Sequence, residues 1–298
     1  MTSARPDILC VGAVLWDVIG RSPAPMAPGA DVPGRIRHVP GGVALNVAVA
    51  LAAREQSVAV LGAVGADPEG DALLAAVRAL GVATDWMQRL PEWPTDIYMA
   101  IEDTHGLIAA VADAHSLEAA GHRVLAPLRD GTFGSAEAPW RGTVVIDGNL
   151  TVAQLEAIAA DPALRQADLR VVPASPGKAE RLAPLLGLDH VTLYLNRAEA
   201  ETLAGHPCTD AAEAAQAVVA RGAARVLVTD GPRPAACAGR GTEVLTQAPP
   251  PVTIARVTGA GDCFMAAHMV AERAGADRAA ALEAAILAAA AHVSGEGP

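Results

Sequence analysis

One glycine-rich segment has the composition needed to bind an anion beside a carboxylate. It reads Val257-Thr258-Gly259-Ala260-Gly261-Asp262 and comes directly before a helical pattern. Glycines allow a tight turn whose backbone N–H groups approach an anion, and the positive end of the following helix adds to the attraction. A carboxylate there can accept a proton from an attacking hydroxyl, as phosphoryl transfer requires. The alternative is an ordinary turn with Asp262 as the helix N-cap, and the segment alone does not distinguish this turn from an anion site.

A second pair of glycines, Gly41 and Gly42, precedes another expected helix. A substrate can lie against such bare backbone, and Asn46 in the first helical turn can donate or accept a hydrogen bond with a sugar hydroxyl. Asp17, in an otherwise apolar run, can accept hydrogen bonds from two vicinal hydroxyls. Taken one at a time, each residue is more often explained without a ligand: the glycines by a tight turn, Asn46 by the start of a helix, and Asp17 by a turn that ends a strand.

Two further segments follow expected strands. Asn196 and Glu199 have the spacing of a helix capping box, but they could also organise water and Mg²⁺ around nucleotide phosphates, with Glu199 acting on the metal indirectly. Thr229 and Gly231 end another strand, where α/β proteins bind ligands, so they are candidates for nucleotide contacts. The alternative for that pair is a simple turn.

The elements that must position these residues alternate along the chain. Strands are expected at residues 8–15, 58–64, 143–147, 169–172, 192–195 and 225–230. Helices are expected at residues 43–54, 70–80, 152–160, 178–186, 198–204, 262–273 and 279–293. This alternation predicts an α/β fold with a central, mainly parallel sheet covered by helices on both faces.

Two segments depart from the alternation. Residues 21–40 are rich in proline and glycine with short β-type stretches, and residues 96–112 alternate as an exposed β ribbon does. Together they predict a small sheet that projects from the main fold as a lid.

Composition narrows the class of protein. The 298 residues are 52% hydrophobic and carry a formal net charge of −11, without a block of Lys or Arg. We therefore expect one domain over residues 1–298 that binds a small molecule, and neither nucleic acid nor a membrane. Lys178 is the only lysine, which excludes a lysine-containing phosphate loop. The four cysteines lack metal-ligand or disulfide spacing, and we expect a cytoplasmic protein with reduced thiols.

Taken in order, the motifs resemble those of the ribokinase-like, or phosphofructokinase-B, family over nearly the whole chain. They are Gly41-Gly42 with Asn46, Gly65-Ala66-Asp67 with Gly70, Asn196 to Glu199, and Thr258 to Asp262. The resemblance implies an ATP- and Mg²⁺-dependent sugar or nucleoside kinase with a β lid over the acceptor. It implies that Asp262 is the base, that the amides of Gly259, Ala260 and Gly261 form the anion hole, and that Asp17, Gly41, Gly42 and Asn46 hold the acceptor.

Finer features bear on the substrate and on cations. Asp147-Gly148-Asn149-Leu150, Lys178-Ala179 and the run 95–113 resemble the pseudouridine kinase branch, which implies transfer to the 5′-hydroxyl of pseudouridine. Arg256 stands where many relatives have an aspartate, and this argues against activation by a monovalent cation. A free-sugar kinase of the ribokinase or fructokinase type, or a nucleotide-sensing module without turnover, remains open. Lids of this family often pair between subunits, so a homodimer is also implied.

Overall fold

The computed structural model describes residues 5–27 and 29–296. Its larger sheet has the strand order β14-β13-β12-β11-β10-β9-β1-β4, and every neighbouring pair from β12 to β4 is parallel. Antiparallel pairs join β12, β13 and β14 at one edge. The strands are β1 (Ile8–Val11), β4 (Val58–Leu61), β9 (Thr143–Asp147), β10 (Asp168–Val172), β11 (Val191–Asn196), β12 (Arg225–Asp230), β13 (Arg233–Gly239) and β14 (Thr242–Gln247).

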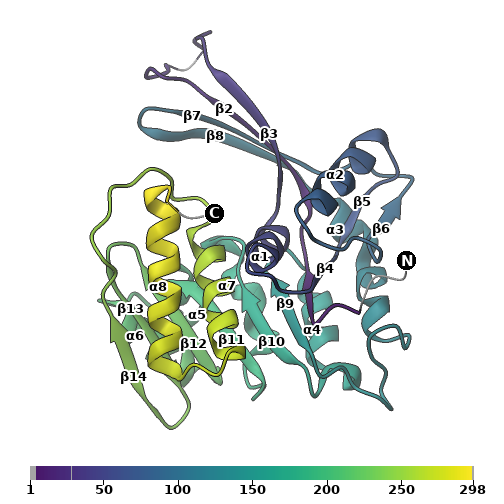
Figure 1. Cartoon of the computed structure of the whole chain (residues 1–298), viewed down its shortest axis with the longest axis vertical. Helices are drawn as coiled ribbons and strands as arrows, with labels where there is room; N and C mark the ends of the chain where they lie inside the picture. The colour runs from purple at the N-terminus through teal and green to yellow at the C-terminus, as the bar shows by residue number, and fades with distance from the viewer. Residues whose placement is uncertain (1–4, 28, 297–298) are drawn as a thin grey trace.

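Helices cover both faces of this sheet, which confirms the expected α/β fold (Figure 1). Alternate residues of one strand enter two separate hydrophobic clusters: Val144 and Ile146 of β9 belong to one and Val145 to the other. Near-continuous apolar runs therefore mark these strands, because neither face meets water. One cluster packs under α1 (Val43–Ala52), α2 (Pro68–Ala79), α7 (Ala260–Arg273) and α8 (Arg278–Ser294); the other packs under α4 (Val152–Ala159), α5 (Arg197–Ala204) and α6 (Ala211–Ala220).

A smaller sheet projects from the larger one, at the top of Figure 1, and we call it the lid. Its strand order is β3-β2-β7-β8, with β2 and β7 parallel and the other pairs antiparallel. Its strands are β2 (Leu15–Arg21), β3 (Arg35–Gly41), β7 (Ile97–Asp103) and β8 (Gly106–Asp113). The expected β elements in segments 21–40 and 96–112 are thus present.

Several local expectations were wrong. Residues 8–15 do not form one strand: β1 ends at Val11, and β2 begins at Leu15 in the lid. Residues 58–64 divide at Gly62 into β4 and a short strand β5 (Ala63–Gly65), which pairs with β6 (Gln88–Leu90). The expected helix at 178–186 is a 3₁₀ helix, η3 (Pro176–Leu185), with Pro184 inside it. A proline ring inside an α-helix clashes with the carbonyl group four residues earlier, here that of Glu180, so the α-helical expectation fails there.

Other elements were not anticipated. These are α6, the β13–β14 hairpin, α3 (Ser116–Ala120) and the short 3₁₀ helices η1 (Gly121–Leu128) and η2 (Pro162–Leu164). Over the described part of the chain, no helix combines the length and apolar character needed to cross a membrane.

Candidate active site

Asp17 lies on β2 of the lid, opposite Val39 of β3 and Tyr98 of β7. It is therefore inside a strand, and the interpretation as a strand-terminating residue is wrong. Burial raises the pKa of the Asp17 carboxyl to about 6. A Cβ atom added to Gly41 would overlap this carboxylate, so only glycine allows the carboxylate to pack against the backbone at the end of β3.

Gly42 is the N-cap of α1 and has a φ of 103°, a conformation that side-chain-bearing residues avoid. A Cβ atom there would also overlap the carbonyl oxygen of Ala13. The helix that begins at this close approach carries Asn46 in its first turn, and the Asn46 backbone N–H donates to Gly42 O at 2.8 Å. The two glycines and Asn46 therefore form one structural unit, as the sequence predicts.

Asp147, at the end of β9, holds the start of α1 in place through hydrogen bonds to backbone N–H groups. Its side chain is fully buried, and its Oδ2 accepts hydrogen bonds from Ala13 N–H at 2.8 Å and Ala44 N–H at 3.1 Å. Asn149 N–H donates to Oδ1 at 2.8 Å, and Lys178 Nζ in turn donates to Asn149 Oδ1 at 2.7 Å. Burial raises the pKa of Asp147, and these hydrogen bonds oppose the shift. The sequence offered one sign of this role, an acidic residue directly after the apolar run Val144-Val145-Ile146.

Asp262 lies in the first turn of α7, which begins after Gly259 in a left-handed conformation with a φ of 85°. Burial raises the pKa of Asp262 to about 7, a hydrogen bond with the Asn46 side chain lowers it, and the charges of Asp147 and Glu199 raise it further. The structure thus brings Asp262 and Asn46 into contact although 216 residues separate them. A carboxyl group with a pKa near neutrality is suited to proton transfer at neutral pH.

The amides before Asp262 differ in what they contact. Ala260 N–H donates to Val257 O at 3.1 Å, which closes a turn. Among the described residues, the N–H groups of Gly259 and Gly261 have no protein acceptor, as expected at a helix start. A Cβ atom added to Gly261 would meet nothing within 4 Å. An anion could therefore approach Gly259 and Gly261 directly, whereas Ala260 would first have to release Val257.

Asn196 and Glu199 form the capping box that the sequence suggested at the start of α5. Glu199 N–H donates to Asn196 Oδ1 at 2.9 Å, and Asn196 N–H donates to Glu199 Oε2 at 2.8 Å. Glu199 is also buried, with 8% of its surface exposed, and burial raises its pKa to about 7. The capping role and the electrostatic role are thus compatible, because the Glu199 charge reaches Asp262.

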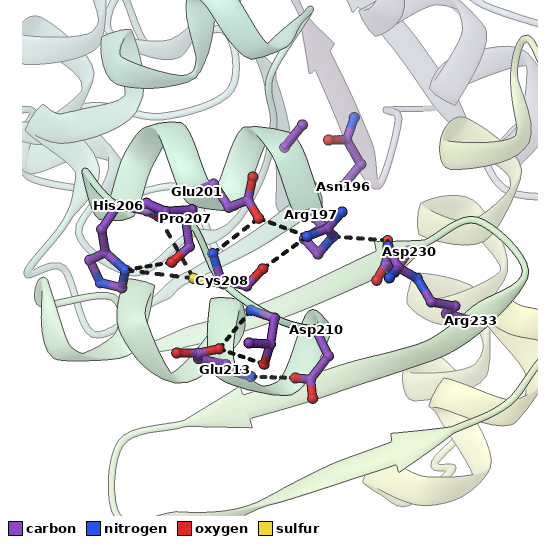
Figure 2. Close-up of polar contacts among 12 residues, drawn as sticks. Asn196, Arg197, Glu201, His206, Pro207, Cys208, Asp210, Glu213, Asp230 and Arg233 are labelled. Carbon is purple, nitrogen blue, oxygen red and sulfur yellow. Dashed lines mark hydrogen bonds and ion pairs between the residues drawn. The ribbon is translucent and has the colours of Figure 1, made fainter.

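Arg197 ties this helix start to the neighbouring strand end (Figure 2). Its Nε donates to Asp230 Oδ1 at 3.1 Å, and its Nη1 donates to Glu201 Oε1 at 2.9 Å. Thr229 pairs directly with Asn196 across β11 and β12, and Gly231 follows in the turn with a φ of 58°. The four nucleotide-side candidates therefore share the carboxyl edge of two adjacent parallel strands, where α/β proteins bind ligands. Sequence reasoning missed the part played by Arg197 and Asp230.

The segment Gly65-Ala66-Asp67 has a structural role in joining α2 to the lid. Asp67 is the N-cap of α2 and accepts hydrogen bonds from Gly70 N–H at 2.7 Å and Thr95 N–H at 2.8 Å. Thr95 lies two residues before β7. The second of the four motifs thus positions a lid strand and lies outside the group around Asp262.

Known proteins share this combination of sequence and fold. A sequence model described as pfkB family carbohydrate kinase matches residues 5–298. The chain belongs to the pfkB carbohydrate kinase family. It is therefore a phosphotransferase of a family of enzymes that bind ATP or ADP and transfer to an alcohol group.

Individual members of the pfkB family resemble the chain over most of its length. It is 30% identical to the pseudouridine kinase of Escherichia coli over 87% of this chain and 81% of that protein. A carbohydrate kinase from Agrobacterium tumefaciens superimposes with a TM-score of 0.79 and 28% identity, over 96% of this chain and 90% of the other. Arabidopsis thaliana ribokinase, complexed with ribose and ATP, superimposes with a TM-score of 0.75 over 97% and 92%, and at 20% identity it supports the fold alone.

The Mg²⁺ expected from the sequence can be compared with the acidic side chains of the structure. Within residues 5–27 and 29–296, no group of three or more His, Cys, Asp or Glu could hold a metal ion. Mg²⁺ usually keeps several waters and binds through one or two carboxylates together with substrate phosphates. The residues thus fit an ion held mainly by phosphate and water, with Glu199 acting through its charge.

Proposed function

We propose that this chain transfers the γ-phosphoryl group of ATP to a primary hydroxyl of a sugar or nucleoside, with Asp262 as the catalytic base. The observation that carries the proposal is the contact between Asp262 and Asn46, which joins the start of α7 to the start of α1. Asp262 borders the N–H groups that suit a phosphate. Asn46 belongs to the unit that ends at Gly42 and Gly41, beside the lid residue Asp17.

The chemistry assigned to each group is simple. The acceptor hydroxyl gives its proton to the Asp262 carboxylate while its oxygen forms a bond to the γ-phosphorus. The bond between that phosphorus and the β–γ bridging oxygen breaks, and ADP leaves. Such transfer depends mostly on positioning and on stabilising charge. The N–H groups of Gly259 and Gly261, that of Ala260 once it releases Val257 O, and the positive end of α7 would provide that charge.

The nucleotide would lie at the carboxyl edge of β11 and β12. Asn196 and Thr229 pair there, and the Gly231 turn gives a backbone without a side chain in the way. Glu199 would orient water around a magnesium ion that the phosphates hold. When bound, that ion supplies positive charge to the phosphate oxygens.

Asp17, Gly41, Gly42 and Asn46 would hold the acceptor, and pseudouridine is our first choice. A carboxylate accepts from two vicinal hydroxyls and an amide both donates and accepts, which suits a ribosyl group. The relative from Escherichia coli named pseudouridine kinase supports this choice at 30% identity. A free sugar, as in a ribokinase- or fructokinase-type enzyme, is the second candidate, and a nucleotide-sensing module without turnover is the third.

One assay separates these candidates. ADP release would be measured at fixed Mg-ATP with pseudouridine, uridine, ribose and fructose. We expect pseudouridine to give the highest kcat/KM. If ribose or fructose exceeds it by more than about tenfold, roughly 1.4 kcal/mol of transition-state discrimination, the nucleoside assignment fails and the kinase assignment stands. ATP binding without ADP release for any acceptor would favour the sensing module.

The proposal includes one kinase domain over residues 1–298 and a homodimer formed through the lid. The lid face opposite Asp17 carries exposed apolar side chains at Ile36, Met99, Ile101 and Val111, with exposed fractions of 78%, 49%, 40% and 69%. Pairing two such faces would remove them from water. Analytical ultracentrifugation would test the homodimer. The double variant Met99→Glu/Val111→Glu should sediment as a monomer, and the unaltered chain should sediment as a dimer.

A further inference from the structure

The last turn of α8 holds the segment that leads to Asp262. Helices α7 and α8 lie side by side, so that the end of α8 meets the start of α7 (Figure 1). Val293 O accepts hydrogen bonds from Ala255 N–H at 2.8 Å and from Arg256 N–H at 3.1 Å. His292 O accepts one from Arg256 Nε at 3.0 Å. The last carbonyl groups of a helix have no partner within it, and here the segment before the anion hole supplies the partners.

The side chain of His292 contacts the same segment further along. Its Nε2 lies 2.8 Å from Thr258 O, and its Nδ1 lies 3.2 Å from Cys263 Sγ. A carbonyl oxygen only accepts, so Nε2 carries a hydrogen and donates it to Thr258 O. In the neutral ring Nδ1 is then an acceptor, and the Cys263 thiol donates to it. Burial raises the pKa of that thiol, which therefore keeps its hydrogen.

Thr258 O belongs to the central peptide of a tight turn. Ala260 N–H donates to Val257 O at 3.1 Å and closes the turn, whose two middle residues are Thr258 and Gly259. Gly259 has a φ of 85° and a ψ of −3°. Among the described residues, Glu55 is the only one other than glycine with a positive φ, so the φ of Thr258 is negative. These angles are those of a type II β-turn.

The orientation of this central peptide decides where the Gly259 N–H points. A type I turn differs from a type II turn by a half-rotation of the central peptide, which changes φ at the third residue from about +80° to about −90°. Glycine adopts either sign of φ, so Gly259 does not select one turn. The hydrogen bond from His292 to Thr258 O does select one. Because C=O and N–H point in opposite directions in a trans peptide, it turns the Gly259 N–H away from the His292 ring.

We propose that His292 is a positioning residue for phosphoryl transfer, because it holds the Thr258–Gly259 peptide with the Gly259 N–H directed at the transferred group. The inference rests on the proposed function for the identity of that group. The His292 ring also packs against Gly259, where an added Cβ would lie 3.2 Å from both Cε1 and Nε2. A backbone donor of this kind acts on charge that develops during transfer. Losing its direction should therefore lower kcat more than it changes the binding of ATP or acceptor.

Two substitutions at one position separate the two bonds of the ring. The amide of Gln lies near the position of Nε2, so His292→Gln keeps a donor to Thr258 O. The amide of Asn lies near the position of Nδ1, so His292→Asn keeps a partner for Cys263 and loses the donor to Thr258 O. Ser294→Ala is the matched control, because it removes another hydrogen bond in the last turn of α8, from Ser294 Oγ to Ala291 O at 3.0 Å.

Steady-state kinetics give the first measurement. We expect kcat of His292→Asn to be at least about tenfold below that of the unaltered chain, with KM for ATP and for the acceptor within about twofold. His292→Gln and Ser294→Ala should keep a kcat close to that of the unaltered chain. Equal kcat values for His292→Asn and His292→Gln overturn the proposal, since a loss common to both would come from the packing of the ring.

Amide hydrogen exchange gives a second measurement that requires no turnover. The peptide covering residues 255–261 should exchange faster in His292→Asn than in His292→Gln, in Ser294→Ala and in the unaltered chain. If the unaltered chain releases no ADP with any acceptor, the proposed function fails, and exchange alone decides whether His292 holds the peptide. Equal exchange in His292→Asn and His292→Gln would show that it does not.

Discussion

The buried carboxylate of Asp147 accepts a hydrogen bond from the backbone N–H of Ala44, at 3.1 Å, and so joins the end of β9 to the first turn of α1. The same Oδ2 accepts from Ala13 N–H at 2.8 Å, in the segment that leads from the large sheet into the lid. One carboxylate thus sets the direction of the chain toward Asp17 and the position of the helix that carries Asn46.

Asp147→Asn should therefore impair both folding and acceptor binding. A carboxamide has a single acceptor oxygen, so one of the buried N–H groups loses its partner, at a cost of about 1–3 kcal/mol in the free energy of unfolding. A shifted α1 should also raise KM for the acceptor. Urea unfolding and steady-state kinetics measure the two effects.

Asp161→Asn is the matched control, because Asp161 is another buried carboxylate that accepts a backbone N–H, from Ala163 at 2.9 Å, away from Asp262. It should lower stability and leave the acceptor KM unchanged. If Asp147→Asn behaves in the same way, the positioning role of Asp147 is wrong.

The Asp147 contacts also explain where sequence reasoning succeeded and where it failed. Strands 143–147 and 225–230 were predicted with the bounds they have, because burial on both faces gives a continuous apolar run that ends at a polar residue. The apolar run 8–15 is equally continuous, but the chain leaves the sheet at Gly12. The group that redirects it, Asp147, is 134 residues away, and no local pattern reports such a contact.

The site was predictable to a similar degree. Glycine pairs and helix starts placed Gly42, Asn46 and Asp262 correctly at the beginnings of α1 and α7. The contact between Asn46 and Asp262 depends on how those two helices pack, which the sequence does not state. The position of Asp17 opposite Val39 depends on the register of β2 and β3, and register was not part of the lid prediction.

Replacing Asp262 by Asn should lower turnover by about 10²–10⁴-fold, the usual contribution of a positioned acid–base group, while nucleotide binding survives. The Asp262 pKa of about 7 also predicts that kcat/KM falls as pH drops below neutrality, since only the carboxylate can accept the proton. Turnover in the purified variant close to that of the unaltered chain would remove Asp262 from the role.

The same substitution should stabilise the fold at alkaline pH. The pKa of Asp262 is higher in the folded chain than its usual value of 3.8, so the folded state favours the protonated carboxyl group. The contribution of this group to the free energy of unfolding is therefore complete at low pH and is lost as pH rises through about 7. A neutral Asn avoids that loss. Thermal unfolding at pH 8 should therefore occur at a higher temperature for Asp262→Asn than for the unaltered chain, and at pH 4 the difference should shrink.

Two glycine substitutions should differ in their effect on stability. Gly261→Ala adds a Cβ into open space at the expected phosphate position, so the fold should persist and turnover should fall by about 10²-fold or more. Gly42→Ala adds a Cβ that overlaps the Ala13 carbonyl at a φ of 103°, so it should lower the unfolding temperature as well. Normal turnover in a folded Gly261→Ala protein would contradict the anion hole.

Asp17→Ala should harm acceptor-dependent turnover far more than ATP binding. A site built to bond hydroxyls leaves buried polar groups unpaired when a partner is missing. We expect kcat/KM for the acceptor to fall by about 10²-fold and KM for ATP to stay within about twofold. Asp17→Asn, which keeps one acceptor oxygen, should lie between the two proteins. Equal losses toward ATP and acceptor would place Asp17 outside the acceptor site.

A buried charge network at the far end of α7 should control stability at acid pH without affecting catalysis. Glu272 binds Arg225, with 2.9 Å between Oε2 and Nη2, and also contacts Arg170. Burial acts to raise the pKa of Glu272, but the arginines overcome it and lower the pKa to about 2. For the basic side chain of His268, burial acts in the other direction and lowers the pKa to about 4. At about 1.5 Å per residue, ten residues of helix place Glu272 about 15 Å from Asp262.

Both shifts make the folded chain lose stability as pH falls. The unfolded state takes up a proton on His268 below about 6.5 and on Glu272 below about 4.5, whereas the folded state resists until about 4 and about 2. The free energy of unfolding should decline from pH 6.5 downward, and His268→Gln should flatten the part between pH 6.5 and 4.

Glu272→Gln leaves two arginines partly buried without a counter-charge and should cost about 3–5 kcal/mol at pH 7. Asp71→Asn, which breaks an exposed pair with Arg89, should cost less than about 1 kcal/mol. Equal costs for the two carboxylate variants, or a lower kcat in Glu272→Gln at a temperature where it is fully folded, would contradict a purely structural role for the network.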